Sequence, residues 1–474
     1  MPESVRLYNT FTRSVDPFQP IYAGEVRMYC CGPTVYSYAH LGNMRAYLFE
    51  DVLHRTLEKA GYQVKHVMNV TDVGHLTSDS DEGDDKMLKA AEREQKGVLE
   101  IAKKYENAFF EDCTALNIKR PTIVCRATEH VQDMIDFVKD LQDKGYAYVA
   151  GGNVYFDTSK YKGYGELARL DLDNLQHGKR VDTDPNKRNP TDFVLWFTDS
   201  KFENQILRWD SPWGVGYPGW HIECSTMSMK YLGERIDIHC GGVDHIPVHH
   251  ENERCQSEAR IGHKWVNVWM HNEFLNMLDG KMSKSKGDTL RVQTLIDKGY
   301  NPLAFRYLFL TTHYRFVQKF SFEILDSAQA AYNNFRNKII ELKKNAPAFT
   351  VQAEALEETR KQFNACVFND LNTSQALVVM WNCLKDEGLN PATKLAAVQD
   401  MDQVLGLGVD AIQEEKAQPV DAQVEDLLKK RKQAREAKDW AAADQIRDAL
   451  AALGYVVKDL PNGETQLMTL TKRS

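Results

Sequence analysis

The sequence predicts an α/β protein: a Rossmann-type domain with a parallel sheet and an insertion, then an α-helical bundle and a small C-terminal α+β unit. Three observations predict this architecture. A strand–loop–helix–strand pattern covers residues 26–70, and a second pattern of this kind begins at Ile236. Beyond about residue 292, helical periodicity continues with few glycines. Strand–helix–strand units imply parallel strands joined by right-handed crossovers.

The first unit opens with an apolar strand at 26–31 and a loop, followed by an amphipathic helix over 43–60 that ends at Gly61. The second strand covers 64–70. The tetrad His40-Leu41-Gly42-Asn43 therefore falls after the first strand and at the start of its helix. Open α/β sheets bind nucleotides at this edge.

The middle of the chain contains an insertion and then the second half of the sheet. Short strands at 153–158 and 192–197 alternate with Gly- and Pro-rich turns. A strand at 236–242 precedes a helix rich in His and Glu, and a further strand lies near 266–274. The acidic stretch 75–95 is expected to be a surface loop that enters a helix.

The end of the chain predicts a linker at 411–424, two helices at 424–439 and 440–453, and a hairpin around Asn462-Gly463. Asp439 is the expected N-cap of the second helix, and Gly454 ends it. We predict the following segments: 1–125 and 214–291 as the two halves of the Rossmann domain, 126–213 as the insertion, 292–410 as the helical bundle, and 421–474 as the C-terminal unit.

The composition of the 474 residues, 43% hydrophobic and 27% charged, is that of a globular protein. No apolar run approaches the roughly 20 residues needed to span a bilayer, so we expect no membrane association. The start of the chain has no apolar signal core, and we expect a cytoplasmic protein. The nine cysteines favour reduced thiols or a metal site over a disulfide scaffold.

The net charge of −8 opposes non-specific nucleic-acid binding but leaves room for a local basic face. The densest basic run is Lys429-Lys430-Arg431-Lys432. A solvated helix face would show the same run.

Two motifs indicate chemistry on a triphosphate. In the tetrad, His40 can donate to a phosphate, Gly42 permits close approach, and Asn43 adds a neutral donor at the helix start. An ordinary helix cap would explain the same residues. The second motif, Lys281-Met282-Ser283-Lys284-Ser285, lies between glycines. Such a loop can close on a triphosphate, so that Lys281 and Lys284 neutralise the charge that develops on pyrophosphate.

A third group of residues suits a metal. Cys31 ends the first strand, Cys224 lies in GWHIECS, and His249 and Glu253 are four residues apart on one helix face. Thiolates, imidazole and carboxylate are zinc ligands. The sequence has no CxxC pair, so distant segments would have to assemble the site. Buried cysteines beside a surface His–Glu pair would give the same pattern.

Together these motifs resemble the cysteinyl-tRNA synthetases, a family of class I aminoacyl-tRNA synthetases. The resemblance runs essentially from end to end. It is carried by the following segments: MYCCGPTVY (28–36), HLGN (40–43), KRNPTDFVLW (187–196), SPWGVGYPGWHIECS (211–225), HHENE (249–253), KMSKS (281–285) and KDWAAADQIRDAL (438–450).

The resemblance implies a cysteine–tRNA ligase that uses ATP with Mg²⁺, L-cysteine and tRNA(Cys). It implies one zinc per chain, held by Cys31, Cys224, His249 and Glu253, which binds the thiolate of the substrate cysteine. A soft thiolate binds zinc far better than a hydroxyl, so the metal would exclude serine without an editing domain. The bundle at 292–410 would contact the tRNA stem and bind the anticodon, and the tail at 421–474 would also bind tRNA. We expect a monomer.

The resemblance also implies further roles. Trp220 and His239 would contact the amino acid, while Gly241, Gly242 and Asp244 would face the adenylate. His40, Lys281 and Lys284 would be catalytic, and the ATP site would comprise His40, Gly42, Asn43, Gly241, Asp244 and Lys284.

Several residues depart from the family pattern or compete with the expected ligands. Asn43 stands where the family often has His. Cys30 precedes Cys31, and alternation along a strand allows only one of these thiols to face the site. Cys240 is a possible spare ligand, and His250 and Glu251 compete with His249 and Glu253.

Two other functions remain open at this point. A related ligase could transfer cysteine to an amino-sugar, but such relatives resemble only the catalytic part. A non-enzymatic RNA-binding paralogue would have no reason to keep both lysines and every ligand.

Overall fold

The structure is a computed structural model. It describes residues 3–73, 97–170, 184–198, 207–278, 290–414, 422–437, 439–453, 455–459 and 465–469. Its centre is a five-stranded parallel sheet, as predicted, with the strand order β11-β10-β3-β4-β5. The strands are β3 (Glu25–Cys30), β4 (Gln63–Val70), β5 (Ile123–Arg126), β10 (Ile236–Gly242) and β11 (Val266–Asn272).

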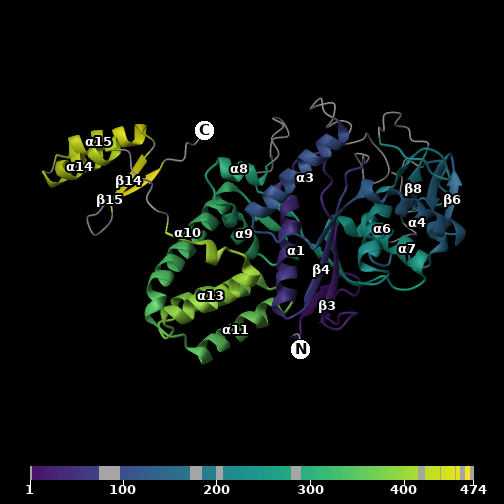
Figure 1. Cartoon of the computed structure of the whole chain (residues 1–474), viewed down its shortest axis with the longest axis horizontal. Helices are drawn as coiled ribbons and strands as arrows, with labels where there is room; N and C mark the ends of the chain where they lie inside the picture. The colour runs from purple at the N-terminus through teal and green to yellow at the C-terminus, as the bar shows by residue number, and fades with distance from the viewer. Residues whose placement is uncertain are drawn as a thin grey trace.

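The strand order predicts a binding crevice at the carboxyl ends of β3 and β10. The chain runs outward from β3 through β4 to β5, then returns to the other side of β3 with β10. Neighbouring strands whose connections leave in opposite directions create a crevice at their carboxyl ends. Helix α1 (Leu41–Lys59) packs on one face of the sheet, while α6 (Trp220–Leu232) and α7 (Glu251–Ile261) lie on the other side (Figure 1).

The insertion between β5 and β10 forms its own antiparallel sheet, β6-β7-β8-β9. Its strands are β6 (Ala147–Ala150), β7 (Asn153–Phe156), β8 (Phe193–Phe197) and β9 (Tyr217–Pro218), and α4 (Val131–Asp143) precedes them. All five residues of β8 are buried, which explains why its sequence is apolar without alternation. This layer ends at Gly219, directly before the helix that carries Cys224.

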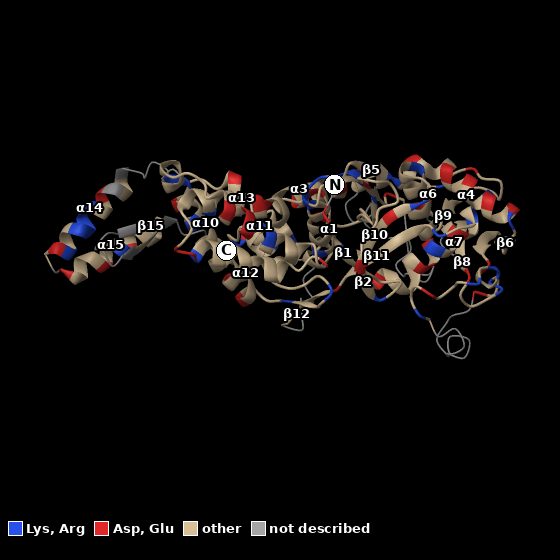
Figure 2. Ribbon diagram, turned by 90° about the horizontal axis from the view of Figure 1, so that it is seen from below, with Lys and Arg blue, Asp and Glu red and all other residues tan. Residues whose placement is uncertain are grey.

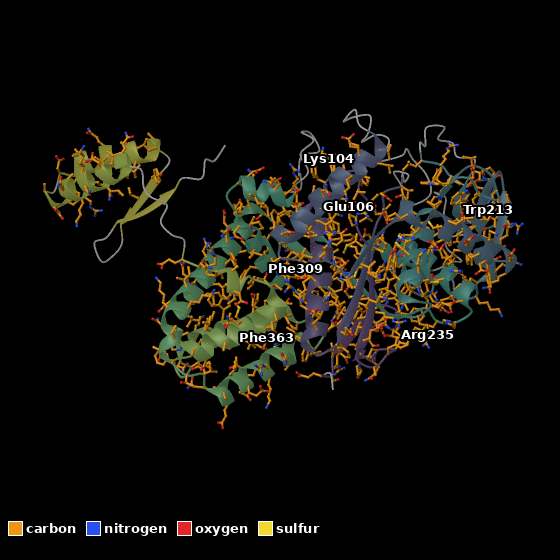
Figure 3. The ribbon with its side chains drawn as sticks, in the orientation of Figure 1. Lys104, Glu106, Trp213, Arg235, Phe309 and Phe363 are labelled. Atoms are coloured by element: carbon orange, nitrogen blue, oxygen red, sulfur yellow. The ribbon has the colours of Figure 1, made fainter. Side chains whose placement is uncertain are left out.

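Helices dominate the chain beyond residue 290, as predicted. They are α8 (Val292–Asp297), α9 (Pro302–Leu310), α10 (Phe322–Asn345), α11 (Ala353–Val367), α12 (Thr373–Lys385) and α13 (Pro391–Leu405). Phe309 and Phe363 point into their shared interior (Figure 3) and are almost fully buried. The same core cluster includes residues of α1, so the bundle and the sheet domain share one hydrophobic core.

The C-terminal unit consists of α14 (Ala422–Glu436), α15 (Trp440–Ala452) and the antiparallel hairpin β14 (Tyr455–Asp459) and β15 (Thr465–Thr469). The Asp439 side chain accepts a hydrogen bond from the Ala442 amide, which confirms it as the N-cap of α15. Gly454 and the predicted turn Asn462-Gly463 lie outside the described residues. Figure 2 shows basic residues, in blue, along the ribbon of α14, where the side chains of Lys429, Lys430 and Lys432 are exposed.

Sequence reasoning missed several small elements. Residues near the start form a hairpin of β1 (Arg6–Asn9) and β2 (Ser14–Pro17), and β12 (Leu275–Met277) pairs in parallel with β13 (Gln318–Phe320). The stretch 75–95 lies entirely outside the described residues, and helix α3 (Val98–Ala115) comes after it in the chain. Within the described part of the chain, none of the helices combines the length and apolarity needed to cross a membrane.

A buried ion pair joins the sheet domain to the helical bundle. The Arg306 Nη2 atom of α9 lies 2.6 Å from Asp51 Oδ2 of α1, and neither side chain is exposed. Asp51 also accepts hydrogen bonds from Arg55 Nε at 2.8 Å and from the Lys119 amide at 2.8 Å. Burial alone would raise the pKa of Asp51, but the two guanidinium groups outweigh it and lower this pKa.

The remaining N–H groups of Arg306 donate to backbone carbonyls of Leu405, Leu116 and Asn117, at 2.6, 3.1 and 3.0 Å. Arg306 therefore ties the ends of α13 and α3 to the middle of α1. Gly406 follows α13 with a φ of 64°, and a Cβ there would overlap the guanidinium. The glycine allows the chain both the left-handed conformation and this close approach.

Asp51→Asn is expected to lower the free energy of unfolding by about 3–5 kcal/mol, because it leaves the Arg306 charge buried without its partner. Urea unfolding measures the loss. Since the folded-state pKa of Asp51 is lowered, its contribution is present above the unfolded pKa of about 3.9 and is lost as pH falls below it. The difference between the two proteins should therefore shrink below about pH 4.

Glu58→Gln is the matched control on the same helix. Glu58 is 40% exposed and pairs with His54 and Lys119, so its loss should cost less than about 1 kcal/mol. Equal losses in the two variants would contradict a special role for the Asp51–Arg306 pair.

Candidate active site and metal centre

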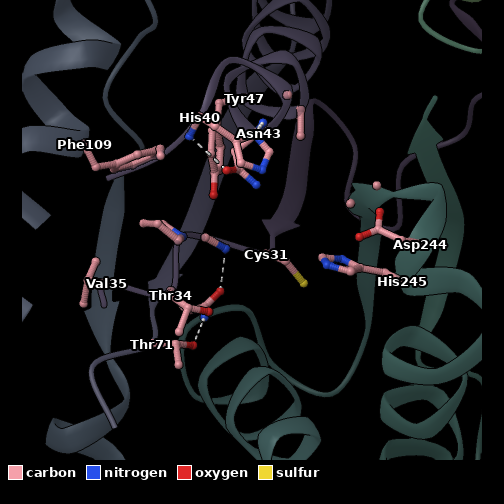
Figure 4. A pocket seen from close by; sticks show the side chains of 18 of the residues that line it. Cys31, Thr34, Val35, His40, Asn43, Tyr47, Thr71, Phe109, Asp244 and His245 are labelled. Atoms are coloured by element: carbon pink, nitrogen blue, oxygen red, sulfur yellow. Dashed lines mark hydrogen bonds between the residues drawn. The ribbon is translucent and has the colours of Figure 1, made fainter. Parts of the chain in front are cut away.

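A cavity of about 470 Å³ opens at the carboxyl ends of β3 and β10, where the strand order places the crevice. Its walls come from the loop after β3, the first turns of α1, the start of α6 and the segment after β10. Figure 4 shows His40 and Asn43 at one end and Asp244 and His245 across from them. This volume is within the range of small-molecule sites.

His40 and Asn43 cap the first helix with reciprocal hydrogen bonds. The Asn43 amide donates to His40 Nδ1 at 3.1 Å, and the His40 amide donates to Asn43 Oδ1 at 3.1 Å. This capping box starts α1 at Leu41, two residues before the predicted start. The tetrad is thus a helix cap, but one that also lines the cavity.

The cap determines how His40 can act. Because Nδ1 accepts the Asn43 amide, the neutral ring must carry its proton on Nε2. Burial lowers the pKa of His40 from its ordinary value, which favours this neutral form. His40 can therefore present an N–H donor beside the N-terminus of α1, where the helix dipole attracts anions.

The four predicted zinc ligands meet in one buried cluster. Their ligand atoms all lie within 4.8 Å of one another. Cys31 Sγ is 4.0 Å from Cys224 Sγ and 3.9 Å from Glu253 Oε1, and His249 Nε2 is 3.0 Å from that same Glu253 oxygen. None of the four residues is more than 8% exposed, and all except Glu253 line the cavity.

The charges of this cluster are tightly coupled. Burial opposes ionisation, but the His239 and His249 rings lower the pKa of Glu253 to about 2. Burial would lower the pKa of His249 as well, yet Glu253 and Cys224 raise it to about 10. A hydrogen bond from Cys31 lowers the pKa of Cys224. A preformed carboxylate and an acidified thiol are what cation binding requires.

Two residues that compete with the predicted ligands have other partners. Glu251 Oε1 lies 2.8 Å from Arg254 Nη2, and Glu251 Oε2 accepts a hydrogen bond from the Ala168 amide. His250 Nε2 lies 3.3 Å from Cys31 Sγ, and its Nδ1 is 2.7 Å from His271 Nε2. His250 therefore belongs to a second geometric group, with Cys31, His239 and Glu253, that lacks Cys224.

The chain forms a π-helical turn, Ile246–His250, directly before α7. The wider turn presents both His249 and His250 to the cluster, although the two are adjacent in sequence. Such π-helical turns occur frequently at functional sites.

Some of the remaining predicted site residues line the cavity and others do not. Trp220, Gly241, Gly242 and Asp244 line the cavity. His239 does not: it is fully buried, and its Nε2 lies 2.9 Å from Glu253 Oε2. His239 therefore supports Glu253 from behind the cavity wall, and a contact between His239 and substrate stays a prediction. Lys281 and Lys284 lie outside the described residues.

Gly241 is required by close packing at the end of β10. A Cβ at this position would lie 2.6 Å from His245 Nδ1 and 2.7 Å from His250 Cε1. Both distances are shorter than a Cβ contact allows, so a side chain here would displace two histidines of the site.

His245 is the main residue that sequence reasoning missed. It lines the cavity, and its buried Nδ1 has no hydrogen-bond partner among the described residues. Figure 4 shows its ring directed toward Cys31. The signal was the density of histidines in HCGGVDHIPVHH, four within twelve residues that begin inside the buried strand β10.

The two adjacent cysteines separate to opposite faces of the sheet. Cys31 packs with the α6 side, whereas Cys30 packs with Cys240 on the α1 side. This placement answers the question of which thiol faces the cavity. It also separates Cys240 from the predicted ligands, so Cys240 is not a spare ligand for that group.

Comparison with known proteins identifies the family. Residues 17–330 match the catalytic domain of class I (C) tRNA synthetases, and residues 417–466 match the anticodon-binding domain of cysteinyl-tRNA ligases. The cysteine–tRNA ligase of Treponema denticola is 45% identical, covering 96% of this chain and 98% of its own length. The chain belongs to the class I cysteinyl-tRNA synthetase family. Cysteine–tRNA ligase 1 of Burkholderia lata is 50% identical, over 97% of this chain and 96% of its own length.

Solved structures of other class I enzymes share the fold. Mycobacterium tuberculosis methionyl-tRNA synthetase in complex with methionyl-adenylate has a TM-score of 0.58 at 15% identity, covering 82% of this chain and 93% of its own. Leucyl-tRNA synthetase AgnB2 of Agrobacterium radiobacter, in a ternary complex with tRNA, has a TM-score of 0.58 at 10% identity, covering 83% and 85%. At these identities the likeness describes the fold alone.

Proposed function

We propose that the protein joins cysteine to tRNA(Cys): it activates L-cysteine with ATP to cysteinyl-adenylate and pyrophosphate, then transfers cysteine to the 3′-terminal adenosine. One observation carries the proposal. A single cavity has a helix N-terminus with a histidine donor at one end and a buried thiol–imidazole–carboxylate cluster in its wall. The first suits a nucleotide phosphate, and the second suits a metal that recognises sulfur.

At the nucleotide end, His40 Nε2 and the amides of the first turn of α1 would bind phosphate oxygens of ATP, which enters with Mg²⁺. Gly42 leaves this approach open: a Cβ there would come within 2.9 Å of the His40 ring. From the sequence, Lys281 and Lys284 would stabilise the charge that builds on the departing pyrophosphate. Asp244, on the opposite wall, would contact the ribose side of the nucleotide.

At the amino-acid end, the donor set of Cys31, Cys224, His249 and Glu253 fits zinc in number, chemistry and burial. When bound, zinc supplies a soft Lewis acid that takes a thiolate in preference to a hydroxyl. His239 holds Glu253 in position, and Trp220 lies against His249 with ring centroids 4.2 Å apart. Trp220 would therefore close the pocket around the small side chain of the substrate.

The transfer step needs no covalent enzyme intermediate. The terminal ribose hydroxyl of the tRNA would attack the activated carbonyl while the cavity holds the adenylate in place. Positioning and charge stabilisation supply the catalysis. The rival acceptor, an amino-sugar, is disfavoured because the chain continues into a helical bundle and a region that matches an anticodon-binding domain.

We further propose that the protein acts as a cytoplasmic monomer. The residues that line the cavity include members of the loop after β3, of α1, of α6 and of the end of β10.

Amino-acid-dependent ATP–pyrophosphate exchange tests the proposed activity across the twenty amino acids. We expect cysteine to support exchange at least 100-fold better than serine, because only the thiolate is a soft ligand. Cys224→Ser should lower cysteine-dependent exchange at least tenfold and reduce bound zinc by one equivalent per chain.

Cys255→Ser is the matched control. Cys255 is also buried on the neighbouring helix, but its sulfur contacts Glu251 and it belongs to no ligand group among the described residues. It should keep its zinc and its exchange activity. Unchanged exchange and zinc in Cys224→Ser would refute the proposed role of the cluster.

His40→Asn separates the cap from the phosphate donor. Asn is a strong N-cap residue, so urea unfolding should show stability close to that of the native protein, while His40→Ala loses about 1 kcal/mol. Exchange should fall at least tenfold in both variants, because both lose the Nε2 donor. Native exchange in His40→Asn would show that His40 serves only the helix.

Replacing Lys429, Lys430 and Lys432 by Gln should raise the KM for tRNA(Cys) in aminoacylation about tenfold, because three cations that can contact phosphates are lost. ATP–pyrophosphate exchange should not change. Glutamine at Lys103, Lys160 and Lys319, which are also exposed, provides the matched control. If both triple variants affect KM equally, α14 has no special part in tRNA binding.

A further inference from the structure

A further group of metal-ligating side chains lies on the α1 face of the sheet. It shares no residue with the predicted zinc ligands, and its Glu50 also lines the larger cavity. Cys30 comes from the end of β3, Glu50 from the middle of α1, and His66 from β4. Their ligand atoms lie within 4.8 Å of one another, and the three residues are 0, 1 and 3% exposed.

The polar atoms of this group lack ordinary partners. Among the described residues, His66 Nε2 and both carboxylate oxygens of Glu50 have no hydrogen-bond partner apart from the weak S–H donor of Cys30. His66 Nδ1 lies 3.3 Å from His54 Nδ1, which leaves Nε2 as the nitrogen available to a ligand.

Such an arrangement is costly without a cation. A buried carboxylate with no cationic or strong hydrogen-bonding partner either loses several kcal/mol of solvation or takes up a proton, and burial accordingly raises the pKa of Glu50 well above its ordinary value. An unpaired imidazole nitrogen also loses solvation, to a smaller degree. Asp51, the next residue of α1, is equally buried but is compensated by Arg306 and Arg55. Glu50 has no such cation among the described residues.

We propose that Cys30, Glu50 and His66 bind a thiophilic divalent cation such as Zn²⁺, at a site separate from the cluster in the cavity wall. Thiolate, carboxylate and imidazole are all zinc ligands. Tetrahedral zinc places N, O and S ligand atoms about 3.4–3.6 Å apart, so the three side chains would move together by roughly 1 Å.

The fourth position has a source of water. A second cavity, of about 70 Å³, is lined by Glu50, His66 and Tyr47. This volume holds at least one water molecule, which needs only about 10–15 Å³.

The cation would join three elements at the base of the nucleotide site. It links the middle of α1 to β3 and β4, and the first turn of α1 carries His40 and Asn43. Its role would be to hold this helix against the sheet, and it does not depend on the function proposed for the other cluster.

Zinc content of the full chain, measured after zinc loading and removal of free metal, tests the site. We expect two equivalents in the native protein and one in Cys224→Ser. Glu50→Gln, which keeps the side-chain volume, should also bind one equivalent. The double variant Cys224→Ser/Glu50→Gln should bind none.

The control is Cys383→Ala, which removes a buried thiol of α12 that belongs to no ligand group among the described residues, and it should retain both equivalents. A Cys224→Ser protein that binds no zinc would overturn the proposal. So would a Glu50→Gln protein with the native zinc content. A protonated Glu50 that shares its hydrogen with Cys30 would then explain the group.

A Co²⁺ titration of the native chain provides a second measurement that depends on no variant. Cobalt–thiolate absorption should saturate at two equivalents. Saturation at one equivalent with the absorption of two thiolates would overturn the second site, because the cluster of Cys31 and Cys224 supplies two thiolates and the proposed site supplies only Cys30. The two proposals can fail separately. If only the cluster of Cys31, Cys224, His249 and Glu253 binds no metal, Cys224→Ser will not change the zinc content. Glu50→Gln will still remove one equivalent.

Discussion

The buried pair of Asp51 and Arg306 is the interaction on which the arrangement of this protein depends. Its two charges are out of contact with water, so each is tolerable only while the other is present. Because Asp51 lies in the middle of α1, the pair fixes the helix that carries the cap of His40 and Asn43 at one end. Because Arg306 also donates to carbonyls near the ends of α3 and α13, the helical bundle is positioned by the same contact.

The site itself follows from the strand order. Connections leave β3 and β10 in opposite directions, and the crevice between them is filled from both sides of the sheet. One side supplies the helix cap of His40 and Asn43, and the other supplies the cluster around Glu253. A ligand between them would have the helix cap at one end and the thiol-containing cluster at the other. Cysteinyl-adenylate has a phosphate and a sulfur in these two places.

Much of this was predictable from the sequence. The strands at 64–70 and 236–242 and the helix after His40 were recognisable because their apolar residues recur with the period of each element. Cys31 and Cys224 lie 193 residues apart, so only the resemblance to a family could pair them. The position of His239 behind Glu253 could not be predicted, because a strand end does not reveal which side chain faces the cavity and which supports a neighbour. Glu50 and His66 escaped notice because each occupies a core position within a periodic element, and periodicity carries no information about a contact between elements.

The Cys30–Cys31 pair makes the function of the site depend on the register of β3. Successive side chains of a strand point to opposite faces, so a shift of one residue would exchange the two thiols between two chemically different environments. The insertion or deletion of a single residue upstream in the strand would have the same result, although hydrophobicity would hardly change. The register of this strand determines which sulfur faces the cavity and which is buried under α1. Changes in loop length elsewhere in the chain would not alter this choice.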